Sequence, residues 1–359
     1  MRIGKFFGIP IELHSSFILL IAVIALVLAV FSPDRFTQTL LLLFFLFLSV
    51  LLHELCHSIV ATELGYKVHK IILLPIGGVA MTETMPKKPK EEFLVAIAGP
   101  AFNFIVVLAV LFAVAAFNLP FPKEIAAEKL EEYVLNFPLF GLVWVNFILG
   151  AFNLFTPALP LDGGRVFRAI LAKFVGFNRA TKMVGKVSSF VAIALFLAGI
   201  LYADFIIAII AVFIYLGSKQ ETENVSVSEN LEKISVSGIV RKKPFLVKGS
   251  ETVEKAFEKM LELNETAALV KLGKGFGVLT LEGVRNVPET RRWDTPAEKA
   301  CFHVPAVARN ADAAALFSQA NAKSIPLFPV AEKGRLFGVV FREDLEKLYA
   351  LRLAANSKK

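Results

Sequence analysis

Residues 40–57 read Leu40-Leu41-Leu42-Leu43-Phe44-Phe45-Leu46-Phe47-Leu48-Ser49-Val50-Leu51-Leu52-His53-Glu54-Leu55-Cys56-His57. A long apolar run therefore ends in three ionisable side chains within five residues. On a helix, His53 and His57 project from one face, one turn apart, which is the spacing that lets two imidazoles hold one zinc ion. Glu54 lies beside the first histidine, where a carboxylate can act as general base toward an attacking water. Because ionisable groups in an apolar helix are costly, the motif predicts a metal site, with an inactive remnant as the alternative.

The composition indicates an integral membrane protein with a soluble part attached. The chain has 359 residues, of which 56% are hydrophobic and 19% charged, whereas a soluble domain has about 45–50% apolar and about 25% charged residues. The formal net charge is +8, but the basic residues mostly flank apolar runs, so they set membrane orientation and we expect no nucleic-acid partner. The two cysteines, Cys56 and Cys301, do not suggest a disulfide framework.

Six apolar segments predict six membrane spans, at residues 15–31, 38–62, 93–117, 139–156, 184–202 and 204–217, of which the last is short for a crossing. The N-terminus shows no cleavage pattern, so we expect the first segment to remain in the protein. A cytoplasmic N-terminus places 13 basic residues inside and 3 outside. The inside residues are Arg2, Lys5, Lys67, Lys70, Lys87, Lys88, Lys90, Arg165, Arg168, Lys173, Arg179, Lys182 and Lys186, and the outside residues are Arg35, Lys123 and Lys129. We therefore expect a multi-pass protein of the cell membrane, with the histidine motif toward the cytoplasmic side.

Residues 66–86 have the composition of a β-hairpin rather than of a loop. A β-branched run, Val68–Leu74, precedes Pro75-Ile76-Gly77-Gly78-Val79-Ala80-Met81. A free strand edge beside a metal could hold an extended peptide by strand addition, which makes Gly77, Gly78 and Val79 candidate substrate-binding residues. The alternative is a surface hairpin that only caps helices.

A second motif follows the fourth span, at Asn153-Leu154-Phe155-Thr156-Pro157-Ala158-Leu159-Pro160-Leu161-Asp162-Gly163-Gly164-Arg165. Asp162 could simply be a turn residue or the N-cap of a helix over 164–175. A catalytic zinc, however, needs a third protein ligand, and the topology puts Asp162 on the same side of the membrane as the histidines. Glu63 is too close to His57 along one helix, and Glu83 stays open as an alternative ligand.

Together these stretches resemble the site-2 protease family of intramembrane zinc metalloproteases. The resemblance covers residues 1 to about 220 and rests on His53-Glu54-x-x-His57, Gly77-Gly78-Val79-Ala80, Ala98-Gly99-Pro100 and Asn153-x-x-Pro157-x-x-Pro160-Leu161-Asp162-Gly163-Gly164. It implies one Zn²⁺ held by His53, His57 and Asp162, with Glu54 activating water and Asn153 stabilising the oxyanion. Cys56 departs from the family, which commonly has glycine there.

The composition changes after Gly217, so we expect a membrane domain over 1–218, a polar linker over 219–233 and a soluble domain over 234–359. The last region contains a repeat of helix, buried strand, second strand and closing helix, which resembles a tandem pair of CBS domains. Members of that family often bind adenosine nucleotides through a threonine and an aspartate. The first copy has Thr280 but Gly283 in the aspartate position, and the second has Asp344 but Phe341 in the threonine position. An adenosine nucleotide ligand and a homodimer through this module are the partners expected by resemblance.

The predicted fold is a polytopic α-helical membrane protein with a small β-hairpin, followed by a soluble α/β tandem CBS module. The predicted function is a zinc-dependent endopeptidase that cuts a single-span membrane protein near the cytoplasmic face, under regulation by the CBS pair. A CBS-regulated metal-ion transporter is the main alternative, but the chain has 5 histidines, no histidine-rich loop and no matching motif in a second half. An inactive scaffold is the other.

Overall fold

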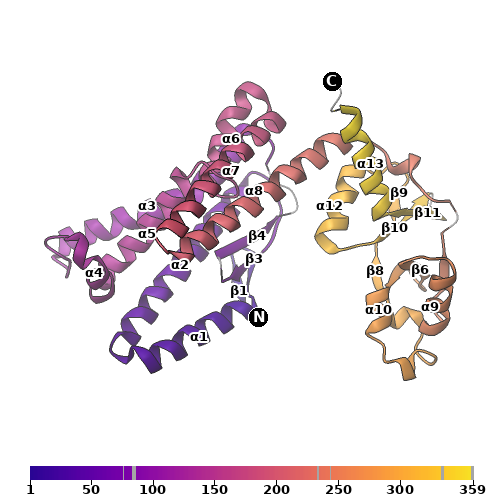
Figure 1. Ribbon diagram of the computed structural model, residues 1–359, viewed down its shortest axis with the longest axis horizontal. Helices are drawn as coiled ribbons and strands as arrows, with labels where there is room; N and C mark the ends of the chain where they lie inside the picture. Colours follow the sequence, from indigo (N-terminus) through magenta and orange to yellow (C-terminus); the bar gives the residue numbers. More distant parts are fainter. Residues whose placement is uncertain (76, 83–85, 233, 243, 333–334, 357–359) are drawn as a thin grey trace. The chain divides into compact units, whose positions relative to one another are not determined.

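The computed structural model describes residues 1–75, 77–82, 86–232, 234–242, 244–332 and 335–356. Its residues group into two compact units, Met1–Thr222 and Glu223–Lys359, which we describe separately (Figure 1). Glu83, the alternative metal ligand, lies outside the described residues.

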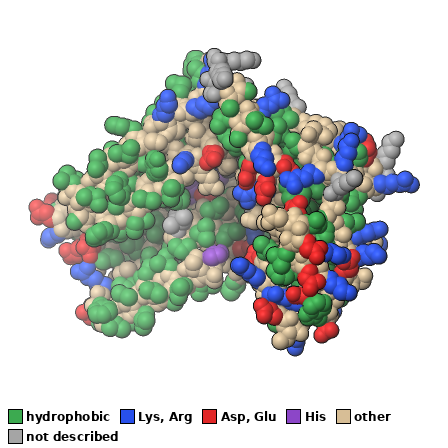
Figure 2. Space-filling model, turned by 45° about the vertical axis from the view of Figure 1, so that its right-hand side comes forward, with side chains coloured by type: hydrophobic (Ala, Val, Ile, Leu, Met, Phe, Trp, Pro, Cys, Tyr) green, Lys and Arg blue, Asp and Glu red, His purple; other side chains and the backbone are tan. Residues whose placement is uncertain are grey.

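Among the residues that the structure describes, five helices are long and apolar enough to cross a membrane. They are α2 (Phe36–Glu63, preceded by the 3₁₀ turn η1, Pro33–Arg35), α3 (Pro89–Phe117), α5 (Pro138–Phe155), α7 (Phe177–Leu201) and α8 (Phe205–Leu231). The first predicted span is a shorter apolar helix, α1 (Ser15–Phe31). Hydrophobic side chains cover much of the visible surface of these helices, as expected for contact with lipid (Figure 2). The protein is therefore a multi-pass membrane protein.

The end of the membrane unit differs from the prediction. We expected a short sixth span and a linker over 219–233, but α8 runs for 27 residues and remains helical through Leu231. The physical reason is that residues 218–231 contain neither glycine nor proline, so their polarity changes the solvent around the helix without ending it.

A four-stranded sheet lies beside α2 in the first unit. The strands are β1 (Arg2–Phe6), β2 (Ile9–Leu13), β3 (Val68–Leu74) and β4 (Gly77–Thr82), in the order β1-β2-β3-β4. The predicted hairpin over 66–86 is confirmed as the antiparallel pair β3–β4, while the β1–β2 hairpin was not predicted. Ile9 and Ile71 pack with Leu55 of α2 and fix the sheet against that helix. Among the described residues, β4 is an edge strand of this sheet.

Shorter helices complete the unit. α6 (Asp162–Val175) follows the proline-rich segment, and η2 (Ala127–Lys129) with α4 (Leu130–Asn136) lies between α3 and α5. α6 contacts α3, α5 and α7, so its first residue is held within the helix bundle.

The second unit is α/β and shows the predicted repeat. The first copy comprises α9 (Val253–Glu262), β6 (Ala267–Lys271), β7 (Phe276–Thr280) and α10 (Leu281–Arg285), and the second comprises α12 (Ala313–Lys323), β10 (Leu327–Glu332), β11 (Arg335–Phe341) and α13 (Arg342–Asn356). Short elements join them: η3 (Val236–Gly238), β5 (Leu246–Lys248), η4 (Glu289–Arg291), α11 (Ala297–Ala300), β8 (Phe302–Val304) and β9 (Val307–Ala308). The strands form two sheets, in the orders β5-β6-β7-β8 and β11-β10-β9. One apolar core contains residues of both sheets, and a second contains residues of the β5-β6-β7-β8 sheet together with α9.

Candidate metal centre

The structure brings His53, His57 and Asp162 together, although 105 residues separate His57 from Asp162 in the chain. The Nε2 atoms of the two histidines are 3.1 Å apart, and they lie 3.1 and 3.2 Å from Oδ2 of Asp162. All three side chains are buried. This is a near-equilateral triangle of ligand atoms within the membrane unit.

The triangle fits zinc. A tetrahedral site with bonds of about 2.0–2.1 Å separates its ligand atoms by about 3.3 Å, close to the three distances observed. Three protein ligands also leave the fourth position that a catalytic zinc requires. In the described part of the chain, no second group of three such side chains is found.

Both histidines are oriented by hydrogen bonds at Nδ1, the ring nitrogen that faces away from the triangle. His57 Nδ1 lies 2.6 Å from the carbonyl oxygen of Val95, which can only accept, so this nitrogen carries the hydrogen. His53 Nδ1 lies 2.6 Å from Oδ1 of Asn103. Each imidazole then presents the lone pair of Nε2 to the centre of the triangle. Two lone pairs and a carboxylate oxygen meeting at 3.1–3.2 Å repel one another unless a cation lies among them.

The segment 153–164 places Asp162 beside the two histidines. Gly163 and Gly164 allow this because their backbone packs closely against the backbone of the residues that precede them. A Cβ on Gly163 would lie 2.5 Å from the carbonyl oxygen of Thr156, and one on Gly164 would lie 2.6 Å from that of Ala158. Leu161 occupies the N-cap position of α6 and Asp162 is its first residue, so Asp162 is not the N-cap. The expected turn thus places a carboxylate at the start of a helix that is packed tightly against the segment preceding it.

Two further glycines lie against the site. A Cβ on Gly99 of α3 would come within 2.6 Å of Nε2 of His53, and it would also overlap Nε2 of His57. A Cβ on Gly78 of β4 would lie 2.5 Å from Cγ of Glu54. Small side chains here let α3 reach the metal ligands and let the edge strand lie directly over the carboxylate beside them.

A buried ion-pair cluster fixes α6 on its other side. Arg168 donates to Glu92 of α3, with Nε 2.7 Å from Oε1, and its Nη2 lies 2.7 Å from Oε1 of Glu221 on α8. The Arg168 guanidinium also lies 4.9 Å from the centre of the Phe177 ring. Because Arg168 is only 3% exposed, these contacts hold the helix that carries Asp162 without competition from water.

Asn153 lies near the end of α5 and is half-buried. The backbone of the next residue, Leu154, lies against Gly163, so this end of α5 packs on the start of α6. Among the described residues, no hydrogen bond joins Asn153 to the triad. Glu63 is exposed at the end of α2, and Cys56 is half-buried with a free thiol.

The structure gives Thr280 and Asp344 separate partners. Thr280 Oγ1 accepts from the backbone N–H of Gly283 and so caps α10. Asp344 accepts two hydrogen bonds from Arg241, at 2.8 and 2.9 Å, and this contact raises the pKa of Arg241. A cavity of about 260 Å³ lies beside this pair, lined by Ile239, Arg241, Asp344, Lys347, Leu348 and Leu351.

Sequence reasoning missed the residues that orient the ligands. No role was assigned to Asn103, Asn146 or Glu92 from the sequence. The available signal was the presence of an amide in a long apolar helix, which needs a partner or a function.

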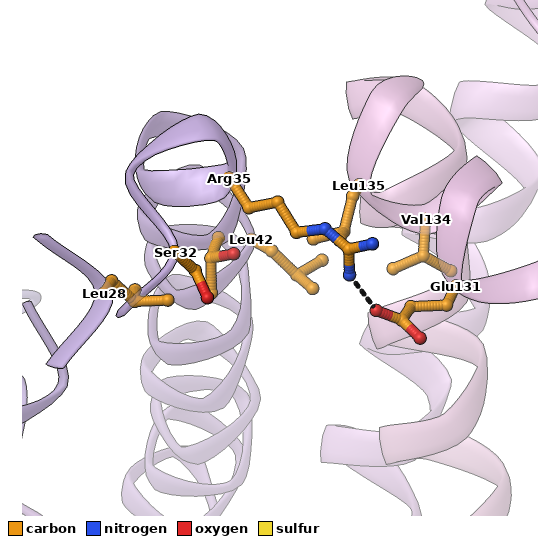
Figure 3. Close-up of a pocket in the computed structure, with 8 residues that line it drawn as sticks. Leu28, Ser32, Arg35, Leu42, Glu131, Val134 and Leu135 are labelled. Atoms are coloured by element: carbon orange, nitrogen blue, oxygen red, sulfur yellow. Dashed lines mark hydrogen bonds and ion pairs between the residues drawn. The ribbon is translucent and has the colours of Figure 1, made fainter. Parts of the chain in front are cut away.

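A larger cavity of about 330 Å³ lies at the opposite end of α2 (Figure 3). It is lined by Leu28, Ser32, Arg35, Thr39, Leu42, Glu131, Val134 and Leu135, and Arg35 is 2.5 Å from Glu131 across it. Thr39 precedes His53 by about 21 Å of helix, so this cavity does not adjoin the metal centre.

Comparison with known proteins agrees with this geometry. Peptidase family M50 matches residues 41–198. A zinc metalloprotease of Methanocaldococcus jannaschii is 37% identical over 262 residues, which cover 73% of this chain and 72% of that protein. The solved site-2 protease of Methanocaldococcus jannaschii is 39% identical and covers 62% of this chain and 94% of its own, with a TM-score of 0.46. The CBS domain of a bacterial CNNM/CorC family Mg²⁺ transporter, solved with ATP, is 19% identical, covers 36% of this chain and 97% of its own, and has a TM-score of 0.32. The 37% identity to the Methanocaldococcus jannaschii zinc metalloprotease extends over more than two thirds of both chains. Together with the family match, it shows that this chain belongs to peptidase family M50 and is a membrane-embedded zinc metalloprotease with His53, His57 and Asp162 positioned to bind the metal.

Proposed function

We propose that this chain is an intramembrane endopeptidase that cuts a single-span membrane protein near the cytoplasmic face. The observation that carries the proposal is the placement of Glu54 between the metal ligands and the edge strand β4. His53 precedes it by one residue, and Gly78 of β4 lies directly over its side chain. An extended peptide added to β4 therefore runs past a carboxylate and a metal centre at once.

Glu54 acts as the general base and then as the general acid. When bound by His53, His57 and Asp162, zinc supplies Lewis-acid polarisation of the scissile carbonyl and of the attacking water. The Glu54 carboxylate takes one proton from that water as the water oxygen bonds to the carbonyl carbon. Glu54 then gives the proton to the amide nitrogen as the carbon–nitrogen bond breaks. The products are an amine and a carboxylic acid, whose remaining proton passes to the amine or to solvent.

The substrate-binding residues are Gly77, Gly78 and Val79. A membrane helix must unwind before its carbonyl groups are accessible, and an edge strand offers the unwound segment backbone hydrogen bonds in place of those it loses. Asn153 has a half-buried amide at the end of α5, which can donate to the negatively charged carbonyl oxygen that forms during attack. These are the roles we assign to the four residues.

The test is Glu54→Gln in detergent-purified or reconstituted protein, with Glu63→Gln as the matched control on the exposed end of the same helix. We expect Glu54→Gln to keep zinc and to lose cleavage of a single-span substrate by about 10²–10⁴-fold. We expect the control to cleave at the parental rate. Turnover of Glu54→Gln near the parental rate would refute the assigned role.

We place the protein in the cell membrane, with its N-terminus and its C-terminal unit in the cytoplasm. The basis is the asymmetry of lysine and arginine between the loops. A C-terminal fusion to green fluorescent protein should be fluorescent, and a C-terminal fusion to alkaline phosphatase should be inactive. The reverse pattern would invert the topology.

The C-terminal unit is proposed to regulate cleavage by binding an adenosine nucleotide near Thr280 and Asp344 and to form a homodimer. A nucleotide ribose at Asp344 has to replace the two hydrogen bonds from Arg241. Isothermal titration of the full chain with ATP and AMP tests this, since Asp344→Asn should weaken binding and leave zinc content unchanged. Light scattering of the detergent complex reports the oligomeric state, with one chain per particle as the contrary result.

A further inference from the structure

A continuous chain of hydrogen bonds extends from His53 away from the metal centre. Oδ1 of Asn103 is 2.6 Å from Nδ1 of His53, and Nδ2 of Asn103 donates to Oδ1 of Asn146 at 2.8 Å. Nδ2 of Asn146 then donates both to Oγ of Ser49 and to the carbonyl oxygen of Leu142, each at 2.9 Å. The chain crosses from α2 to α3 and α5 and returns to α2, and both asparagines are 0% exposed.

The direction of every bond in this chain is fixed by its far end. A backbone carbonyl can only accept, so the group of Asn146 that faces Leu142 must be its NH₂. The oxygen of Asn146 therefore faces Asn103, so the NH₂ group of Asn103 must be the donor to it. The oxygen of Asn103 is left facing His53, whose Nδ1 must then carry the hydrogen. Nε2 of His53 is consequently a lone pair directed at the carboxylate oxygen of Asp162.

We propose that Asn103 and Asn146 are positioning residues that transmit the polarity of the Leu142 carbonyl to His53 and so set the imidazole tautomer required for zinc binding. This inference rests on the proposed zinc centre and goes beyond it, because it assigns a function to two buried amides that touch neither substrate nor metal. His57 needs no such relay, since its Nδ1 already faces the carbonyl of Val95.

The cost of the arrangement favours a functional role over packing. Two fully buried amides in an apolar bundle are expensive unless each donor and acceptor is paired, and apolar residues of the same size would pack without that requirement. Both oxygens accept one bond here, and the NH₂ of Asn146 makes two. What an apolar pair cannot provide is the fixed acceptor at Nδ1 of a metal ligand.

The experiment compares Asn103→Leu with Asn103→Asp, both close to asparagine in size, in the full-length protein. Zinc affinity is measured by competition with a chromophoric chelator, and thermal unfolding of the metal-free protein reports whether each variant is folded. A carboxylate at position 103 can only accept, so it keeps the hydrogen of His53 on Nδ1 although it gives up the hydrogen bond to Oδ1 of Asn146. Leucine accepts nothing. We expect Asn103→Leu to weaken zinc binding by about 10–100-fold and Asn103→Asp to bind more tightly than Asn103→Leu. Thr181→Val, a buried polar-to-apolar change on α7, is the control and should leave the affinity unchanged.

A packing role predicts the opposite order, because leucine suits an apolar interior and a buried carboxylate does not. Zinc affinity of Asn103→Leu equal to or higher than that of Asn103→Asp would therefore overturn the proposal. If Asn103→Leu does not fold, Asn146→Leu takes its place, since it removes the fixed polarity but leaves Asn103 present. Unchanged zinc affinity in a folded Asn146→Leu would also overturn the proposal. Failure of the parent protein itself to bind zinc would refute the metal centre, which separates the two ideas.

Discussion

Replacing Gly99 by alanine should strongly weaken zinc binding while leaving the fold intact. The added Cβ would lie 2.6 Å from Nε2 of His53, whereas ordinary van der Waals contact begins at 3.4 Å. The His53 ring must therefore move by about 0.8 Å, and the His57 ring must move further because its Nε2 is closer still. Zinc sites keep their ligand distances within about 0.2 Å, so this displacement is about four times what the centre tolerates. The helix itself gains from the change, because alanine is favoured over glycine by about 1 kcal/mol in a helix interior.

The assay is elemental analysis of zinc in detergent-purified protein, combined with thermal unfolding. Gly4→Ala is the control, because its added Cβ meets nothing closer than 3.7 Å. We expect zinc affinity to fall at least about 100-fold in Gly99→Ala, equivalent to about 2.7 kcal/mol, while the metal-free variant unfolds at or above the parental temperature. A Gly99→Ala variant that holds zinc as tightly as the control would refute the geometry described for α3 and the two histidines.

Other contacts of the membrane unit can be tested at Gly78, Arg168 and Lys70. Gly78→Ala pushes a methyl group against Cγ of Glu54 at 2.5 Å, so it should lower kcat while zinc content, measured by elemental analysis, stays constant. Arg168→Leu leaves the buried carboxylate of Glu92 and the half-buried carboxylate of Glu221 without the Arg168 guanidinium. Chemical unfolding in detergent should therefore show a loss of about 3–5 kcal/mol, and parental stability would contradict the role of Arg168 in holding α6. The hydrogen bond from Lys70 lowers the pKa of Glu12 on β2. The stabilisation by this pair is therefore fully present above the ordinary glutamate pKa and is lost as the pH falls through the lowered pKa of Glu12. Lys70→Ala should therefore flatten the acid side of the stability profile, and an unchanged profile would argue against the pair.

The metal ligands were accessible to sequence reasoning because their chemistry is local. His53 and His57 are four residues apart, a spacing that brings two side chains together only on a helix. Asp162 follows two prolines and precedes two glycines that the turn requires. Gly78 was also predicted within a strand, but the sequence did not show that this strand lies over Glu54. That contact depends on how β3 and β4 join β2, and the β1–β2 hairpin was not predicted at all.

The residues that orient the centre could not be predicted because they depend on tertiary packing. Asn103 and Asn146 come from α3 and α5, which both pack against α2. The rotation of packed helices depends on the sum of many side-chain contacts, none of them distinctive in sequence. The extension of α8 through Leu231 was missed for another reason. A change from apolar to polar composition marks the end of the membrane, and a helix can pass that boundary when no residue in it breaks the helix.

The central claim is that one zinc ion is held by two histidines of α2 and the aspartate that begins α6. The most direct test is the zinc content of purified parent protein and of Asp162→Ala after equilibration with zinc and removal of loosely bound metal. The account predicts about one zinc per chain in the parent and loss of zinc in the variant, with both proteins folded. Retention of zinc by Asp162→Ala at the parental affinity would contradict the account and move the third ligand to another residue.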